Sequence, residues 1–290
     1  MKVNELFADK TVFSFEVYPA KKTAPIQVVY DAVNALADLG PDFISVTYGA
    51  GGGAANASAT VEIASLIENT YHLPAVAHLP GINLTREELG DLLMRLAAHR
   101  LENVLALRGD VIPGTKPTGE FAHASEVAEF IGQHIPDYFN IIGACYPEVH
   151  PEATSAADDL HWLRHKIDTG VDQLATQLFF DNQHFYNFLI RAREAGITVP
   201  IEAGIMPVVN ARQAARMVEL CGTNLPPAFV ALVERYGDND DEMRAAGIDY
   251  ATAQILDLIE HDVDGIHLYT MNDPNTAAAI SAVIKPLTDR

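Results

Sequence analysis

Short apolar runs alternate with longer amphipathic stretches from one end of the chain to the other. The runs are rich in β-branched and aromatic residues, and they cover residues 12–18, 43–50, 73–80, 103–110, 140–147, 173–180, 200–208 and 265–271. Such runs are typical of buried strands, and a pattern with helical periodicity follows them. The strand starts are mostly about 30 residues apart, which is a plausible length for a βαβ unit. The pattern predicts eight parallel βα units.

The stretch 155–170 illustrates the helices expected between these strands. It begins at Ser155, a residue that caps helices, and it ends at Gly170. Four apolar residues recur within it at helical spacing: Ala156, Leu160, Leu163 and Ile167. The remaining polar positions are expected to face away from the core.

The spacing changes once, between the seventh and eighth strands. There 56 residues, 209–264, intervene, with "NLPPAF" at 224–229 and two helical stretches after it. No linker or low-complexity segment interrupts the chain. We therefore predict an α/β protein in which residues 1–290 form a single (β/α)8 TIM barrel, with an extended helical insertion at about 209–264.

Composition narrows the expected partners and compartment. Acidic residues number 39 against 19 basic ones, which gives a net charge of −20 that disfavours binding to nucleic acid. No apolar run approaches the ~18 residues of a membrane span, and the first residues do not resemble a signal peptide. Cys145 and Cys221 make no disulfide framework. These features predict a cytoplasmic globular protein.

Polar residues gather where the predicted strands end. A (β/α)8 barrel builds its active site at the carboxyl ends of its strands. The residues in question are Glu16, Thr47, Tyr48, His78, Arg108, Asp110, Tyr146, Gln177 and Tyr269. We expect these side chains to line the mouth of the barrel.

Glu16 is the candidate acid. Strand alternation places Phe13, Phe15 and Val17 on one face and Glu16 on the other, pointing into the mouth. A carboxyl group there loses hydration, which favours its protonated form, as a general acid requires. The alternative is a structural glutamate paired with an arginine or lysine.

Two motifs allow more than one interpretation. "GAGGGA" (49–54) fits a dinucleotide fingerprint, but it follows the second of eight similar strands and not the first strand of a Rossmann half. Its glycines instead suit a loop that approaches a flat ligand closely. "LALRGD" (105–110) is either a capped turn with a surface ion pair or part of the mouth.

The stretch "ACYPEVHPEA" (144–153) raises the question of a metal site. Its Cys, Glu and His residues match no zinc spacing, and two prolines hold the chain extended. We predict no metal there. On the next helix Asp159, Trp162 and Lys166 form a stripe that, with this loop, either lines a groove for an extended polar ligand or is a solvated face.

In this order "FSFEVYP", "DFISVTYGAGG", "NVLALRGD", "ACYPEVHPEA", "TQLFFDN", "GIMPVVN" and "GIHLYTMN" resemble 5,10-methylenetetrahydrofolate reductases of the bacterial, single-domain type. The resemblance extends from about residue 12 to 272. It implies a flavin-containing (β/α)8 enzyme in which NAD(P)H reduces FAD and the flavin then reduces 5,10-methylenetetrahydrofolate to 5-methyltetrahydrofolate.

The resemblance also implies roles for individual residues. Glu16 is the general acid that opens the folate imidazolidine ring, and Asp110 serves both flavin tuning and folate binding. Gln177, Phe185 and Tyr269 are expected beside the substrate. The positions that match flavin-binding residues are Thr47, His78, Leu107, Arg108, Gly109, Asp110, Ala124, Tyr146, His150, Asp159 and Lys166.

Several positions depart from the family pattern. His123 stands where a tyrosine is usual, and Trp162 and His165 replace an asparagine and an arginine near the FAD phosphates and adenine. Near the substrate, Ala211 replaces an aromatic residue and Asp273 replaces an arginine. Two alternatives therefore stay open: direct hydride transfer from the nicotinamide without bound flavin, and a non-catalytic folate- or flavin-binding subunit. We expect a homo-oligomer, and the sequence does not distinguish NADH from NADPH.

Overall fold

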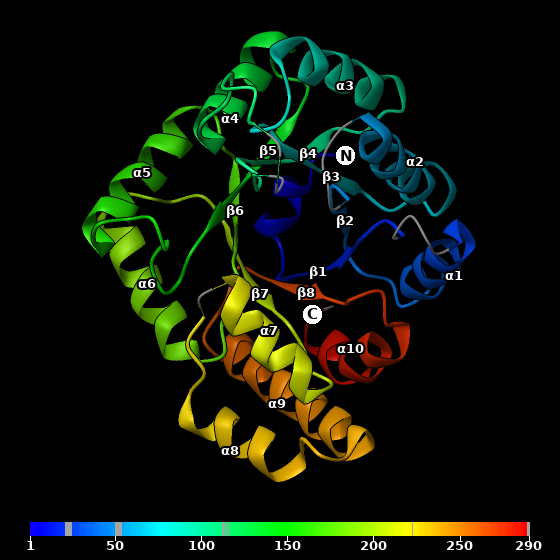
Figure 1. Cartoon of the computed structure of the whole chain (residues 1–290), viewed down its shortest axis with the longest axis vertical. Coiled ribbons are helices and arrows are strands. Elements are labelled where there is room, and N and C mark those ends of the chain that lie inside the picture. The colour runs from blue at the N-terminus through cyan, green and yellow to red at the C-terminus, as the bar shows by residue number, and fades with distance from the viewer. Residues whose placement is uncertain (21–24, 50–53, 112–113, 115, 222, 289–290) are drawn as a thin grey trace.

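Eight parallel strands close into a barrel in the computed structural model, which describes residues 1–20, 25–49, 54–111, 114, 116–221 and 223–288 (Figure 1). Each strand pairs with its neighbours in sequence, and β8 pairs with β1. The strands are β1 Val12–Val17, β2 Ile44–Val46, β3 Ala75–Pro80, β4 Asn103–Leu107, β5 Asn140–Cys145, β6 Gln173–Thr176, β7 Ile201–Ile205 and β8 Gly265–Tyr269. The predicted (β/α)8 barrel and its eight strands are confirmed.

Helices surround the strands in the order expected for this barrel (Figure 1). They are α1 Ile26–Ala37, α2 Ala54–Thr70, α3 Arg86–Ala98, α4 Ala124–His134, α5 Ala156–Asp168, α6 Asn182–Glu194, α7 Ala211–Cys221, α8 Pro227–Tyr236, α9 Asp240–Glu260 and α10 Pro274–Thr288. Ser155 caps α5 by accepting a hydrogen bond from the Asp158 backbone N–H. Its side-chain oxygen satisfies one of the amide donors that a helix start leaves without a partner.

Between β7 and β8 the described residues form three helices. Helix α7 precedes the proline-marked turn, and α8 and α9 follow it. Helix α9 belongs to the helical layer around the strands, because its Ala251, Ile255 and Leu258 are buried in the main core. Helix α8 lies outside this layer at the edge of the molecule (Figure 1). The two helices are joined by an aromatic contact, in which Phe229 of α8 stacks on Phe180 and meets the edge of Tyr250 of α9. This contact attaches α8 to the loop after β6.

The largest apolar core lies between the strands and the helices. Phe13, Phe15 and Val17 of β1 are all buried within it, so the outward direction predicted for them is confirmed. Because alternate residues of a strand face opposite sides, Ser14 and Glu16 point into the barrel. The alternation along β1 thus separates packing residues from polar ones.

The N-terminal segment closes the bottom of the barrel. A short 3-10 helix, η1 (Val3–Ala8), lies inside the ring of strands (Figure 1). Val3 packs with Val12, Phe43 and other interior side chains, and its N–H donates to Oδ1 of Asn103 at 2.8 Å. Solvent therefore reaches the barrel interior from the mouth and not from below.

Candidate active site

Two buried histidines flank Glu16 at the mouth of the barrel. Oε2 of Glu16 lies 3.5 Å from Nε2 of His78 on β3 and 3.8 Å from Nε2 of His267 on β8. The Glu16 side chain keeps 20% of its surface exposed, whereas the two imidazoles keep 8% and 5%. Among the described residues these histidines are the ion-pair partners of Glu16. The carboxyl group is therefore reachable from the mouth, and no arginine or lysine of the described part of the chain pairs with it.

The two histidines differ in protonation. Burial lowers the pKa of His78 to about 4, against the opposing charge of Glu16, so this imidazole is neutral at pH 7. Burial also disfavours the charged form of His267, but the Glu16 hydrogen bond and the Glu202 and Glu16 charges outweigh it and raise the pKa of His267. Glu16 thus faces one neutral ring and one ring that holds its proton more tightly than usual.

A chain of buried polar groups continues from His267 toward the bottom of the barrel. Nδ1 of His267 lies 2.6 Å from Oγ of Ser14, and that hydroxyl lies 2.8 Å from Oε1 of Glu202 on β7. Oγ of Ser45 lies 3.2 Å from the other ring nitrogen of His267. Gln173 on β6 contacts the second oxygen of Glu202 at 3.4 Å. These contacts connect the carboxyl group of Glu202, deep in the barrel, through Ser14 and His267 to that of Glu16 at the mouth.

Glu202 is 1% exposed, and burial raises its pKa to about 7. A buried carboxyl without a cation directly beside it favours the neutral form. Our sequence interpretation missed Ser14, Glu202 and His267. The available signals were the alternation that puts Ser14 on the face of Glu16, and a single acid within the otherwise apolar "PIEAGI".

The predicted residues at the other strand ends form the rim of the mouth. Thr47 donates its N–H to the Val17 carbonyl at 2.9 Å. Leu107 accepts from the Gly81 N–H at 3.0 Å. Gly109 has a φ of +81°, and a Cβ there would lie 2.5 Å from Cβ of Pro80, so glycine is required at this turn. The glycine-rich loop is only partly visible, since residues 50–53 lie outside the described residues.

Of the four residues predicted beside the substrate, three lie near strand ends and the fourth packs in the core. The Gln177 side chain accepts from the Leu178 N–H, and Gln177 lines a hollow with Tyr146. Tyr269 donates its hydroxyl to the Thr176 carbonyl at 2.7 Å. Asp110 is exposed, and its carbonyl accepts from Asn83. These three lie at or just after the ends of strands.

Phe185 is the exception, because it packs in the core. Its side chain is fully buried, and its ring stacks on Phe179 with centroids 5.4 Å apart and planes 5° from parallel. The cause is its position one turn into α6, on the face that covers the barrel. A direct substrate contact is not available to it in this arrangement.

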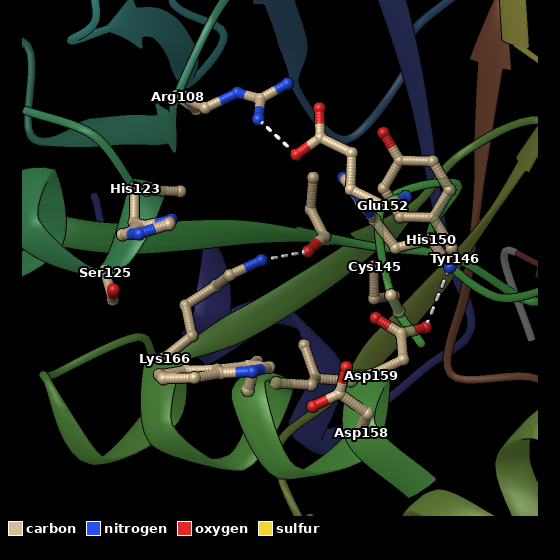
Figure 2. Close-up of a pocket in the computed structure, with 15 residues that line it drawn as sticks. Arg108, His123, Ser125, Cys145, Tyr146, His150, Glu152, Asp158, Asp159 and Lys166 are labelled. Atoms are coloured by element: carbon tan, nitrogen blue, oxygen red, sulfur yellow. Dashed lines mark hydrogen bonds and ion pairs between the residues drawn. The ribbon is translucent and has the colours of Figure 1, made fainter. Parts of the chain in front are cut away.

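A separate cleft lies between the end of β5, the start of α4 and one face of α5. It brings together six of the residues predicted to bind flavin: Arg108, Ala124, Tyr146, His150, Asp159 and Lys166. In Figure 2 Arg108, His123 and Lys166 approach this space from different elements. The remaining predicted flavin residues belong to the rim described above, apart from His78, which lies beside Glu16.

Two cations enter this cleft. Lys166 is partly buried and donates from Nζ to the Ala144 carbonyl at 2.6 Å, and the loss of hydration around its ammonium group lowers its pKa. Arg108 pairs with Glu152, with the nitrogen and oxygen 2.6 Å apart. Asp159 accepts from the His150 N–H at 3.0 Å, and burial raises the pKa of its carboxyl. The cleft therefore offers positive charge together with aromatic surface, a combination that fits a phosphate-containing aromatic ligand such as FAD.

The stretch 144–153 uses its polar groups for other contacts. Cys145 is buried, and burial raises the pKa of its thiol to about 12. Glu148 accepts from the N–H and the side-chain amide of Asn224, while Glu152 pairs with Arg108. In the part of the chain that the structure describes, no group of three or more His, Cys, Asp or Glu side chains could hold a metal ion. Nor is any helix of that part long and apolar enough to cross a bilayer.

Comparison with known proteins identifies relatives along almost the whole chain. A family described as "Methylenetetrahydrofolate reductase" matches residues 2–285. "5,10-methylenetetrahydrofolate reductase" of Salmonella typhimurium is 35% identical over 270 residues, covering 92% of this chain and 88% of that protein. "Methylenetetrahydrofolate reductase (NADH) 1" of Arabidopsis thaliana is 35% identical over 284 residues. The alignment covers 93% of this chain but 48% of the plant protein, so the chain spans about half the length of its plant relatives.

A solved structure supports the same fold. An uncharacterized protein from Clostridium thermocellum, described as binding two copies of 5-methyl-5,6,7,8-tetrahydrofolic acid, superimposes with a TM-score of 0.68. The two chains are 13% identical, and each is covered to 97%. At that identity the likeness extends to the fold alone. The family match and the bacterial relatives are decisive: this chain belongs to the methylenetetrahydrofolate reductase family.

Proposed function

We propose that the protein reduces 5,10-methylenetetrahydrofolate to 5-methyltetrahydrofolate with a hydride from NAD(P)H that passes through FAD. The observation that carries this proposal is the placement of Glu16, a partly exposed carboxyl group between two buried imidazoles at the mouth of the barrel. The family supports folate reduction. The names of the plant relatives specify NADH as their donor, which favours NADH here.

The proton step falls to Glu16. The methylene carbon bridges two nitrogens of the folate, and it accepts a hydride only after the five-membered ring has opened. Protonation of N10 makes that nitrogen a leaving group and produces an iminium ion at N5. Glu16 reaches this position from the mouth, and His267 beside it holds its own proton tightly. The positive charge of the protonated His267 ring can therefore stabilise the carboxylate that Glu16 becomes after it gives up its proton.

Rim residues orient the folate. Gln177 offers a side-chain amide, and Tyr269 closes the mouth beside His267, with ring centroids 5.4 Å apart. Asp110 is exposed at the end of the loop that follows β4, where its negative charge favours the cation that develops on the opened folate. These assignments follow the family motifs and agree with the position of each residue at a strand end.

FAD, when bound, supplies the hydride. Arg108 and Lys166 would face its phosphates, while Tyr146, His150, Ala124 and Asp159 would line the rest of the cleft. Thr47, His78, Leu107 and Gly109 would border the flavin ring at the rim. Gly109 suits this role because its backbone lies against Pro80 with no room for a side chain.

Direct hydride transfer from the nicotinamide is the second candidate. His123 and Trp162 line the cleft where the family has a tyrosine and an asparagine, and His165 on the same helix stands where the family has an arginine. The missing arginine removes one charge-assisted bond to a diphosphate. A non-catalytic binding subunit is disfavoured, because it has no need of a carboxyl group between two buried histidines.

Glu16→Gln tests the proposal. The amide keeps the shape of the side chain but donates no acidic proton, so folate reduction should fall about 10²- to 10⁴-fold. Reduction of the flavin by NADH should remain within a few-fold of the wild-type rate. Glu62→Gln, the same change in an exposed carboxyl on α2, is the matched control and should leave both rates unchanged. Folate turnover at the wild-type rate in Glu16→Gln would exclude Glu16 as the acid.

A further inference from the structure

Glu202 is a buried acid to which the proposed function gives no role. It lies on β7, deep in the barrel, and 1% of its surface is exposed. The residue beside it on β8 is Gly265, where an added Cβ would lie 2.9 Å from Cγ of Glu202. The glycine therefore leaves the space that this side chain occupies. Among the described residues no lysine or arginine pairs with the carboxyl group, so its burial depends on polar contacts.

Two side chains contact the carboxyl group of Glu202. Nε2 of Gln173 donates to Oε2 at 3.4 Å. The Ser14 hydroxyl donates to Oε1 at 2.8 Å, and its Oγ lies 2.6 Å from Nδ1 of His267. The Ile266 carbonyl, 3.4 Å from the same Oγ, is a more distant acceptor. Because a hydroxyl donates one proton and a carboxylate only accepts, ionised Glu202 makes Ser14 an acceptor toward His267 and so requires a proton on Nδ1.

The other ring nitrogen of His267 faces the mouth. Nε2 lies 3.8 Å from Oε2 of Glu16 and 3.2 Å from Oγ of Ser45, while Tyr269 meets the ring edge-on. With Nδ1 already protonated, a second proton on Nε2 makes the ring a cation beside Glu16. Burial disfavours this cation, but the Glu16 hydrogen bond and the charges of Glu202 and Glu16 raise the pKa of His267. The inner acid thus contributes to the charge of the ring at the mouth.

The other titratable groups around these contacts do not replace Glu202. His78 is neutral at pH 7, because burial lowers its pKa to about 4. Asp42 adds to the effect of burial in raising the pKa of Glu202, but its own carboxylate pairs with Lys10. On the Nδ1 side, therefore, the described residues place one carboxyl group within a single hydroxyl of His267, and that group is Glu202.

We propose that Glu202 is a positioning residue for the proton step and that it acts on Glu16 through His267. When Glu202 is ionised, the hydrogen bond through Ser14 holds a proton on Nδ1 and its charge keeps the ring cationic. The cation then stabilises the carboxylate that forms when Glu16 gives its proton to the folate. This inference rests on the proposed function, and it gives a role to an acid that lies outside the sequence motifs.

Nitrogen NMR of protein with isotope-labelled histidines tests the effect on His267, whose signals are identified by their loss in His267→Gln. In the wild-type protein the ring should lose its Nε2 proton as pH rises and keep the proton on Nδ1. Glu202→Gln keeps the shape of the side chain without its charge, so the ring should titrate about one pH unit lower. The exposed Glu62→Gln should leave this titration unchanged. A neutral wild-type ring with its proton on Nε2 would overturn the proposal, even if Glu202→Gln failed to fold.

Stopped-flow reoxidation of the reduced flavin by 5,10-methylenetetrahydrofolate tests the effect on Glu16. At pH 7.5 Glu202→Gln should react about tenfold more slowly than wild-type protein, the equivalent of one pH unit. Folate affinity and flavin reduction by NADH should not change. The deficit should disappear below the pH at which the His267 ring of the variant titrates, since both proteins then hold the cation. A deficit of the same size at every pH would show a structural disturbance and overturn the positioning role.

The two experiments separate this inference from the proposed function. Wild-type protein that does not reduce the folate would overturn the proposed function, and with it the role of Glu202 in the proton step, whatever the titration of His267. Folate reduction together with an unchanged His267 titration in Glu202→Gln would overturn the positioning role alone and leave Glu16 as the acid.

Discussion

The barrel interior and the cleft beside α5 hold polar groups in opposite ways. Beneath Glu16, the residues Ser14, Glu202 and His267 are each at most 4% exposed as whole residues, and each contacts a side chain from another strand. In the cleft, Trp162 is 57% exposed and the carboxylate of Glu152 is 63% exposed. The residues proposed for the proton chemistry thus lie on strands, whereas those proposed for the cofactor lie on helices and loops.

The two regions should therefore differ in how well they tolerate substitution. Replacing a residue of the interior leaves a buried partner without its hydrogen bond, at a cost of about 1–3 kcal/mol. Replacing an exposed residue of the cleft costs little, because water takes up the freed groups. Exposed cleft residues such as Trp162 should thus be replaced at a lower cost in stability than the buried residues beneath Glu16.

Glu202→Gln should give the largest change in stability, and it tests the buried polar groups of the barrel interior. The folded protein holds the Glu202 proton up to a pKa of about 7, whereas an unfolded glutamate releases it near 4.3. The free energy of unfolding should therefore decrease as pH rises between these values, by on the order of 3 kcal/mol. The raised pKa of His267 acts in the same direction, since its stabilisation is lost as pH rises through the folded value.

The glutamine variant removes the Glu202 part of this dependence. Urea unfolding from pH 4.5 to 8 should show a flatter profile for Glu202→Gln than for wild-type protein. Glu62→Gln, a change at an exposed carboxyl, should keep the wild-type slope. A Glu202→Gln profile with the full wild-type slope would mean that the carboxyl group is ionised in the folded state at low pH, contrary to its burial.

Lys166→Met tests the cleft. The ammonium is buried, so its removal deletes a charge-assisted contact to the dinucleotide while sparing the protein a desolvated charge. Dinucleotide affinity should fall about tenfold, equivalent to about 1.4 kcal/mol, and the melting temperature should not fall. Arg164→Met on the same helix, where Arg164 pairs with Asp168, is the control and should bind normally. Unchanged affinity in Lys166→Met would place the phosphates elsewhere.

Glu152→Gln should give the smallest effect. The pair of Glu152 with Arg108 is largely exposed, so losing it should change stability by less than about 1 kcal/mol. The freed Arg108 should then bind an anionic dinucleotide about two- to fivefold more tightly at low salt, with the gain screened as ionic strength rises. Calorimetric titration at two salt concentrations measures both. Weaker binding in this variant would show that the ion pair orients Arg108 productively.

Sequence patterns predicted the barrel and the direction of Glu16 because both follow from periodicity. Eight apolar runs marked the strands, and alternation along β1 fixed which side chains enter the barrel. The strands end earlier than the runs suggested, for example at Val46 and Thr176, since the polar residues that follow turn outward into the rim. The local sequence pattern was sufficient to predict the position and direction of side chains that depend only on their own strand.

The remaining features depend on partners far away in the sequence. Glu202 lies 188 residues from Ser14 in the sequence, and no local sequence pattern predicts their contact. Phe185 matched a motif position, but its place on the buried face of α6 decided its role as a core residue. Trp162 was interpreted as part of a helical stripe, and no local sequence pattern predicts that the ring of His123 lies parallel to it.

Anaerobic half-reactions of the purified wild-type protein test the central claim most directly. Flavin absorbance should bleach when NADH is added and should return when 5,10-methylenetetrahydrofolate follows, with one 5-methyltetrahydrofolate formed per flavin reoxidised. A colourless protein that oxidises NADH only in the presence of 5,10-methylenetetrahydrofolate would contradict the flavin relay in favour of direct transfer. A flavin that bleaches with NADH but is not reoxidised by the folate would contradict the assignment of Glu16 and its rim as the folate site.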